Sequence, residues 1–190
     1  RPVLEASAAT APTSHEILIV PGSGFGTGHH ESTRLALQLL QHDIIHAIAP
    51  KQSLDLGTGN GILALGTALL YGSAVRAIDI DPIAIENAAE NLSLNPQLRD
   101  LISLEVGSFD APEAERFDLI TANIFAEVLA QYELRFYSSL KSGGALVMAG
   151  ITYHSWAIIE AAFPPARWTP ISKLTENGWV GAGYRKKAAG

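Results

Sequence analysis

Residues 53–61 read SLDLGTGNG, which is the most specific local signal in the sequence. Residues 53–56 are predicted to form a short strand, and a helical pattern follows over Gly59–Tyr71. Gly57, Gly59 and Gly61 alternate in the turn between them, so a ligand can lie against the backbone at the positive end of the helix. Asp55, just before the first glycine, suits a ligand with a cationic amino group. The stretch predicts a strand–turn–helix unit with a binding site at its turn.

The next predicted strand, over 74–79, ends in Asp79. Asp81 then occupies an N-cap position and Pro82 the first position of a helix. A carboxylate at this strand end can accept hydrogen bonds from both ribose hydroxyls of a nucleoside. The glycine turn and Asp79 together therefore predict a nucleoside site. The spacing differs from the G-x-G-x-x-G pattern of nicotinamide dinucleotide sites, since Ile62 stands at the third glycine, so an oxidoreductase is a weaker alternative.

The rest of the chain alternates between strand and helix patterns, which predicts an α/β fold with a mostly parallel sheet and helices on both faces. Strands are predicted over 16–20, 101–106, 117–122, 145–149, 168–174 and 179–185, and helices over 31–48, 82–94, 124–140 and 153–163. Gly143-Gly144 is expected to end the helix over 124–140, whose apolar stripe includes Phe125. Asn177-Gly178 predicts a C-terminal hairpin that adds an antiparallel strand at the edge.

Asn123 lies at the end of the predicted strand over 117–122, in the sequence TANIF. In open α/β sheets, ligands bind beyond the carboxyl ends of the strands, so Asn123 is expected beside Gly57 and Asp79. Its amide oxygen can accept a hydrogen bond from a substrate amine. The alternative is that Asn123 only caps the following helix.

Composition and charge exclude several classes of protein. The 190 residues are 47% hydrophobic and contain no cysteine, which supports a packed core and excludes disulfide scaffolds and thiolate sites. The net charge of −6 disfavours binding of duplex nucleic acid through its phosphates. No membrane span or secretory signal is evident in the sequence, and a cytoplasmic protein is expected. His42 and His46 are spaced like half of a metal site, but no third ligand is evident, so no metal is predicted.

Six segments in this order resemble the PrmA family of S-adenosylmethionine-dependent methyltransferases, which modify a protein of the large ribosomal subunit. They are FGTGHHEST, LDLGTGNGILAL, AIDIDPIAIENAAENLSLN, FDLITANIFAEVL, KSGGALVMAGI and a late tryptophan, Trp179. The resemblance extends from Glu16 to Arg185. It implies a Rossmann-like, seven-stranded class I methyltransferase sheet, with S-adenosylmethionine as the methyl donor. The chain is then interpreted as an arm or linker over 1–15, a methyltransferase domain over 16–187 and a tail over 188–190.

The resemblance also implies roles for individual residues. Phe25 to Gly28 would fold over the cofactor, and either Ser108 or Phe109 would meet the adenine edge. His30 stands at the family's histidine position, and it could either line the substrate entrance or pack the loop. The expected cofactor-binding residues are Thr27, Thr33, Gly57, Gly59, Gly61, Asp79, Ser108 and Asn123.

The expected activity is N-methylation of a protein amine, either a lysine side chain or an N-terminus, and a ribosomal protein is one candidate acceptor. Methyl transfer is an in-line displacement, so the enzyme mainly positions and desolvates the reactants. Asn123 is the expected catalytic residue, which orients a neutral amine whose proton leaves to water. Two alternatives are methylation of a peptide or small molecule, and a non-catalytic module that binds S-adenosylmethionine or S-adenosylhomocysteine.

Overall fold

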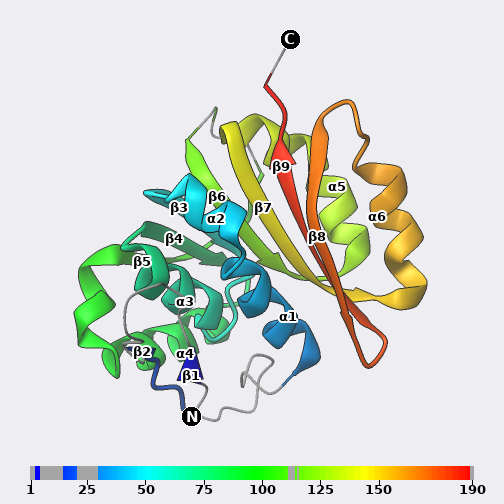
Figure 1. The fold of residues 1–190 in the computed structure, drawn as a ribbon. Helices are drawn as coiled ribbons and strands as arrows, with labels where there is room; N and C mark the ends of the chain where they lie inside the picture. The colour runs from blue at the N-terminus through cyan, green and yellow to red at the C-terminus, as the bar shows by residue number, and fades with distance from the viewer. Residues whose placement is uncertain (1–2, 5–14, 21–29, 111–113, 115, 189–190) are drawn as a thin grey trace.

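The computed structural model describes residues 3–4, 15–20, 30–110, 114 and 116–188. Within these residues, seven strands form one sheet in the order β5-β4-β3-β6-β7-β9-β8, and β1 (Val3–Leu4) pairs with β2 (His15–Glu16) apart from it (Figure 1). The sheet strands are β3 (Gln52–Leu56), β4 (Ala74–Asp79), β5 (Ile102–Val106), β6 (Phe117–Asn123), β7 (Leu140–Thr152), β8 (Trp168–Glu176) and β9 (Trp179–Lys186). Strands β3 to β7 run parallel, and β9 runs antiparallel to both β7 and β8. The predicted α/β fold with a C-terminal hairpin is confirmed.

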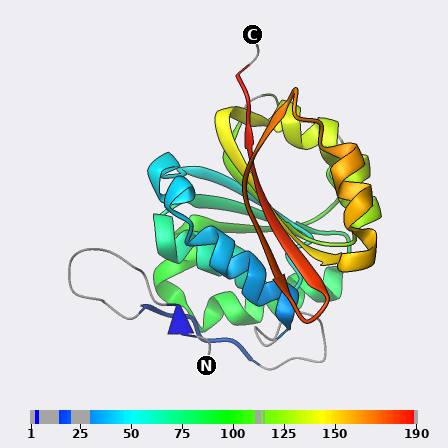
Figure 2. The ribbon, with the colours of Figure 1, turned by 45° about the vertical axis from the view of Figure 1, so that its right-hand side comes forward.

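Helices cover both faces of the sheet, as expected (Figures 1 and 2). Helices α1 and α3 pack into one hydrophobic core and α5 and α6 into the other. The α-helices are α1 (Glu31–Leu40), α2 (Asp43–Ile48), α3 (Ile62–Tyr71), α4 (Pro82–Ser93), α5 (Ala126–Ser139) and α6 (Trp156–Ala162), and two 3₁₀-helices span Pro96–Leu101 and Tyr153–Ser155. Among the described residues, no helix is both long and apolar enough to cross a membrane.

The strand order places the site. The chain builds β3, β4 and β5 outward in one direction and then returns to place β6 on the other side of β3. The carboxyl ends of β3 and β6 therefore diverge into connections that leave in opposite directions. In open α/β sheets this switch point is where a crevice forms.

Two local signals act as the sequence predicts. The Asp81 side chain caps α4 by accepting from the backbone N–H of Ile83 at 2.9 Å, and Pro82 begins the helix. At the hairpin, Asn177 and Gly178 have φ values of 47° and 82°, which suit the tight turn between twisted antiparallel strands.

The strand predicted over 16–20 is wrong beyond Glu16, because residues 17–20 belong to no strand. The backbone there bonds to side chains instead. Leu18 N–H donates to the Asn95 side chain at 3.0 Å, and Val20 N–H donates to the Asn91 side chain at 2.9 Å. Two buried asparagines of distant sequence thus replace a neighbouring strand.

The single helix predicted over 31–48 is also wrong, because α1 ends at Leu40 and α2 begins at Asp43. His42 separates them, and its Nδ1 accepts from Ile44 N–H at 3.2 Å. This side-chain cap starts a new helix. The Nδ1 of His42 is therefore used in capping α2.

The helix predicted over 124–140 ends at Ser139, so Gly143-Gly144 does not stop it. The two glycines lie inside β7, which begins at Leu140. Gly143 has φ +74°, and the pairing of β6 with β7 shifts register at this end. The glycines thus serve an irregularity of the strand rather than a helix end.

Candidate functional site

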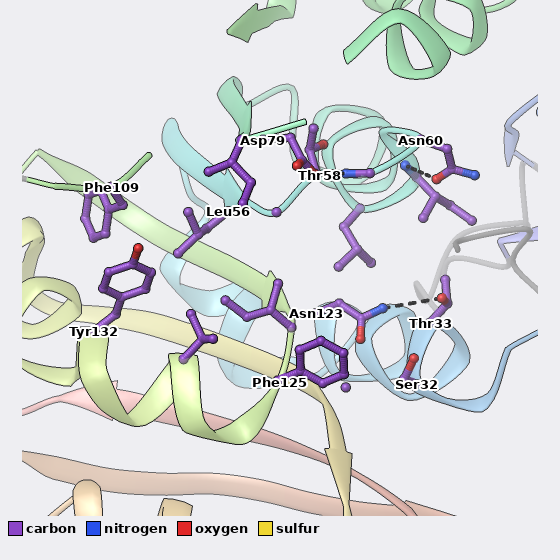
Figure 3. A pocket seen from close by; sticks show the side chains of 18 of the residues that line it. Ser32, Thr33, Leu56, Thr58, Asn60, Asp79, Phe109, Asn123, Phe125 and Tyr132 are labelled. Carbon is purple, nitrogen blue, oxygen red and sulfur yellow. Dashed lines mark hydrogen bonds between the residues drawn. The ribbon is translucent and has the colours of Figure 1, made fainter. Parts of the chain in front are cut away.

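A cavity of about 470 Å³ opens at the carboxyl ends of β3, β4 and β6, at the switch point of the sheet (Figure 3). Its polar lining includes six of the predicted cofactor residues, and apolar side chains form most of the rest. The six predicted residues are Thr33, Gly57, Gly59, Asp79, Ser108 and Asn123, and the apolar side chains include Leu56, Leu63, Ile80, Phe109, Ile124, Phe125, Val128 and Tyr132. The structure therefore brings together side chains that are up to 90 residues apart in sequence.

The glycine turn leaves β3 with backbone angles that disfavour other residues. Gly57, Gly59 and Gly61 have φ values of 67°, 57° and 84°. A Cβ at Gly57 would lie 2.5 Å from the Ile124 side chain, so the turn also packs closely against the end of β6. Gly61 faces Ala88 of α4 and does not line the cavity.

The Asp79 carboxylate is fixed at the cavity by two backbone donors. Its Oδ2 accepts from Gly59 N–H at 2.9 Å, and its Oδ1 accepts from Asp81 N–H at 3.0 Å. A carboxylate oxygen has two acceptor positions, so each can still accept from a ligand hydroxyl. Asp79 thus ties the turn to β4 and presents acceptors to the cavity.

Asn123 ends β6 and faces the first turn of α1. Its Nδ2 lies 3.4 Å from the Oγ1 of buried Thr33 and donates to it (Figure 3). Within the described part of the chain, the Oδ1 of Asn123 has no hydrogen-bond partner. A Cβ on Gly150 would come within 3.0 Å of this oxygen, so the glycine keeps the space beside it open. The side chain is therefore held by its donor, and its acceptor remains available.

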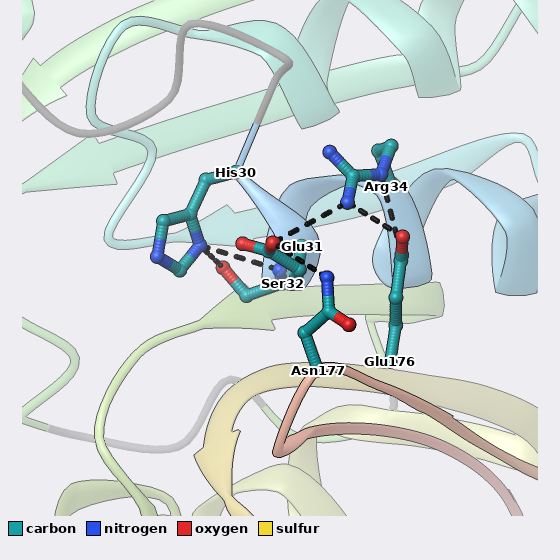
Figure 4. Close-up of polar contacts among 6 residues, drawn as sticks. All are labelled: His30, Glu31, Ser32, Arg34, Glu176 and Asn177. Atoms are coloured by element: carbon teal, nitrogen blue, oxygen red, sulfur yellow. Dashed lines mark hydrogen bonds and ion pairs between the residues drawn. The ribbon is translucent and has the colours of Figure 1, made fainter.

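The first turn of α1 is fastened to the β8–β9 hairpin (Figure 4). The Arg34 Nη2 lies 2.6 Å from the Glu176 Oε1, and Asn177 donates to the Glu31 carboxylate at 3.1 Å. The Asn177 hydrogen bond is the main reason that the pKa of Glu31 lies below its usual value. These contacts hold the helix that carries Thr33.

His30 stands at the start of α1 and lines the cavity. Its Nδ1 lies 2.8 Å from the Ser32 hydroxyl and accepts from Ser32 N–H at 3.3 Å, which caps the helix. Its ring packs edge-on against Trp179, with 4.7 Å between centroids. His30 thus lines the cavity and packs against β9, while the loop before it, over 21–29, lies outside the described residues.

Asp55 does not line the cavity, so the structure does not support the interpretation that it meets a cationic amino group. Its carboxylate is fully buried beneath the glycine turn and does not line the cavity. Thr121 donates to its Oδ1 at 2.6 Å and Thr58 to its Oδ2 at 2.7 Å. Burial raises the pKa of Asp55 to about 6, and these two hydrogen bonds oppose the rise. Asp55 joins β3, β6 and the turn from within.

The remaining predicted residues have different outcomes. Ser108 lines the cavity, and its hydroxyl donates to the Asp110 carboxylate. Phe109 lines it as a buried ring stacked on Phe136, with 6.0 Å between centroids. Thr27 and the segment Phe25 to Gly28 lie outside the described residues, as does most of the arm over 1–15.

Two residues at the mouth were missed. Phe125 was assigned to the buried stripe of the following helix, but it precedes α5 and is 70% exposed. Ile80, directly after Asp79, is 76% exposed. Each is a large apolar residue just past a strand-ending polar residue, and this position is the signal that could have identified them. Together they give the cavity an apolar rim.

No group of three or more histidine, aspartate or glutamate side chains in the described ranges could hold a metal ion. His46, the second member of the histidine pair considered above, packs edge-on against Tyr71, with 5.2 Å between centroids.

Comparison with known proteins identifies the family. The model of the family described as ribosomal protein L11 methyltransferase (PrmA) matches residues 2–187. A ribosomal protein L11 methyltransferase of Pelobacter propionicus is 39% identical over 170 residues, which cover 88% of this chain and 54% of that protein. One from Bacillus subtilis is 37% identical over 161 residues, covering 84% and 50%. The chain thus spans about half the length of these two relatives.

Solved structures agree. A ribosomal protein L11 methylase from Lactobacillus delbrueckii subsp. bulgaricus superposes with a TM-score of 0.76 at 32% identity, covering 90% of this chain and 86% of that one. An RNA methyltransferase from Salinibacter ruber, solved in complex with S-adenosyl-L-homocysteine, has a TM-score of 0.60 at 19% identity, covering 81% and 89%, and shares the fold alone. On the family match and these relatives, the chain belongs to the ribosomal protein L11 methyltransferase (PrmA) family.

Proposed function

We propose that this protein binds S-adenosylmethionine in the cavity at the switch point and transfers its methyl group to an amine nitrogen of a protein. The observation that carries this proposal is the convergence of the glycine turn, Asp79 and Asn123 on one mostly apolar cavity. The relatives are named for ribosomal protein L11, and we propose the same acceptor for this chain. Action on a ribosomal protein would place the enzyme in the cytoplasm.

The lining suits the proposed cofactor. Asp79 would accept from the ribose hydroxyls, because its carboxylate is already oriented by two backbone donors. Gly57 and Gly59 would let the ligand lie against the turn. The apolar side chains beyond them, with Ser108 at one edge, would take the flat adenine. When bound, S-adenosylmethionine supplies a methyl carbon made electrophilic by the positive charge on its sulfur.

Asn123 would orient the acceptor. Its Nδ2 is committed to Thr33, so its Oδ1 is the group that would accept from the attacking amine. The amine must be neutral to attack, and the apolar lining disfavours the charged form by excluding water. The exposed rim residues Phe125 and Ile80 offer contact area to an acceptor larger than the cavity, which favours a protein over a small molecule.

The first experiment is calorimetric titration of the protein with S-adenosylhomocysteine and, separately, with NAD. Saturable binding of the first alone is expected, whereas binding of NAD would instead support an oxidoreductase. Labelled-methyl transfer is then measured with ribosomal protein L11, a lysine peptide and free lysine. Binding without transfer to any acceptor would favour the non-catalytic alternative, and transfer to free lysine alone the small-molecule one.

Asn123→Ala tests the catalytic assignment. We expect turnover to fall at least about tenfold, equivalent to about 1.4 kcal/mol of transition-state stabilisation. Asn87→Ala is the matched control, because Asn87 is a half-buried asparagine of α4 that does not line the cavity. Turnover near the wild-type value in Asn123→Ala would contradict the assigned role.

A further inference from the structure

Asn91 lies in the last turn of α4, and Asn95 follows the end of that helix, four residues later. Both side chains are buried, with 2% and 1% exposure. The Asn95 side chain pairs with a single residue of the 17–20 segment. Its Oδ1 accepts from Leu18 N–H at 3.0 Å, and its Nδ2 donates to Leu18 C=O at 2.8 Å. The amide thus bonds to Leu18 as the peptide group of a neighbouring strand would.

Asn91 joins two segments instead of one. Its Oδ1 accepts from Val20 N–H at 2.9 Å, and its Nδ2 donates to the backbone C=O of Asn60, also at 2.9 Å. Asn60 lies between Gly59 and Gly61 and lines the cavity. One buried amide therefore connects the end of the 17–20 segment to the glycine turn of the site.

In the described structure, three side chains from outside the turn bond to it, each at a different point. Asp55 accepts from the Thr58 hydroxyl, Asp79 accepts from Gly59 N–H, and Asn91 donates to Asn60 C=O. Of the three, Asn91 is a side-chain donor to a backbone carbonyl, so it fixes the plane of the peptide between Asn60 and Gly61. Losing the donor would leave a carbonyl of the turn without this partner, and the turn would sample other orientations.

We propose that Asn91 is a positioning residue for cofactor binding. It does not line the cavity, and it acts by holding Asn60 and by tying the 17–20 segment to the same turn. Occupation of the turn by a ligand therefore also steadies residues 17–20. The proposal rests on the function proposed above, because the ligand is taken to be S-adenosylmethionine or its product.

Asn91→Asp and Asn95→Asp form a matched pair. Each keeps the acceptor for a backbone N–H of the 17–20 segment, and each replaces donor hydrogens by a buried carboxylate oxygen. The lost donors of Asn95 reach Leu18 C=O and Asn91 C=O, at 2.8 and 2.7 Å, and not the glycine turn. Both variants should therefore unfold at lower temperature than the wild type, but only Asn91→Asp should disturb the turn.

The test is calorimetric titration with S-adenosylhomocysteine, well below the unfolding temperature of each variant. We expect Kd to rise at least about tenfold in Asn91→Asp and to stay within about twofold of wild type in Asn95→Asp. Hydrogen exchange adds a second measurement. Without ligand, amides of residues 57–62 should exchange faster in Asn91→Asp alone, and ligand should slow exchange of residues 17–20 in the wild type more than in that variant.

Equal changes of Kd and of exchange in the two variants would overturn the proposal, since they would show a general loss of stability. If Asn91→Asp does not fold, Asn91→Ala and Asn95→Ala replace the pair, because alanine buries no charge. Failure of the wild type to bind S-adenosylhomocysteine would refute the proposed function. In that case exchange of residues 57–62 without ligand still decides whether Asn91 positions the turn.

Discussion

Thr121 and Thr67 are both buried to 1% exposure, but only Thr121 has a hydrogen-bond partner in the described structure. Thr121 donates to the Asp55 carboxylate at 2.6 Å. Thr121→Val keeps the shape and removes this donor. A hydrogen bond to a charged group contributes about 1.5–3 kcal/mol, so at pH 8 we expect this loss in the free energy of unfolding. In a domain of this size, it lowers the melting temperature by about 3–12 °C.

The loss should depend on pH. The pKa of Asp55 is about 6 in the folded protein, above the ordinary value of 3.8, so ionisation of Asp55 opposes folding. The stability that this group contributes is full below about pH 4 and is lost as the pH rises through 6. Thr121→Val removes a contact that favours the ionised form, so it raises the pKa further. At pH 5 Asp55 is mostly protonated, and the loss should shrink to about 1 kcal/mol.

The assay is chemical unfolding of the wild type, Thr121→Val and Thr67→Val at pH 5 and pH 8. Thr67→Val is the matched control and should be neutral or stabilising at both pH values, because it removes a buried hydroxyl that has no partner among the described residues. Thr121→Ser should keep the pH dependence of the wild type. Equal losses for Thr121→Val at the two pH values would refute the reasoning, since the hydrogen bond would then not act on the charge of Asp55.

Two further predictions concern the glycine turn and the side of the sheet that α5 and α6 cover. Gly57→Ala and Gly178→Ala both force alanine into a positive φ, but only at Gly57 would the new Cβ meet a side chain, that of Ile124 at 2.5 Å. Only Gly57→Ala should therefore abolish calorimetric binding of S-adenosylhomocysteine. Binding in both variants would contradict the close packing. Glu133→Ala leaves the buried Trp168 Nε1 without the carboxylate that accepts from it at 2.5 Å, and we expect a loss of about 2–4 kcal/mol by chemical unfolding, with ligand affinity unchanged.

The regular part of the fold could be predicted from the sequence because its signals are local. The glycine turn, Asp79 at a strand end and the Asn-Gly hairpin each depend on a few adjacent residues. The family resemblance then supplied the number of strands, whereas their order came from the structure. Asn123 could be placed beside the turn because parallel strands bring their carboxyl ends to one edge.

The sequence-based predictions fail where a distant side chain or a helix cap determines the local structure. Residues 17–20 have the pattern of a strand, but their partners are the side chains of Asn91 and Asn95, more than 70 residues away. His42 divides the predicted helix because it caps α2. Histidine is not among the residues that most favour an N-cap, so the sequence gives little sign of this division. The burial of Asp55 beneath the turn could not be predicted either, because it follows from the packing of β3 against β6.

The same packing has a consequence for the lifetime of the protein. The crevice lies on the seam between the half of the sheet that carries Asp79 and the half that carries Asn123. A small molecule bound in the cavity would contact both halves of the sheet and stabilise their packing. Because the unfolded chain has no such site, ligand at 100 times its Kd adds about 2.7 kcal/mol to the folded state. Resistance to proteolysis should therefore rise with the concentration of a molecule that binds there.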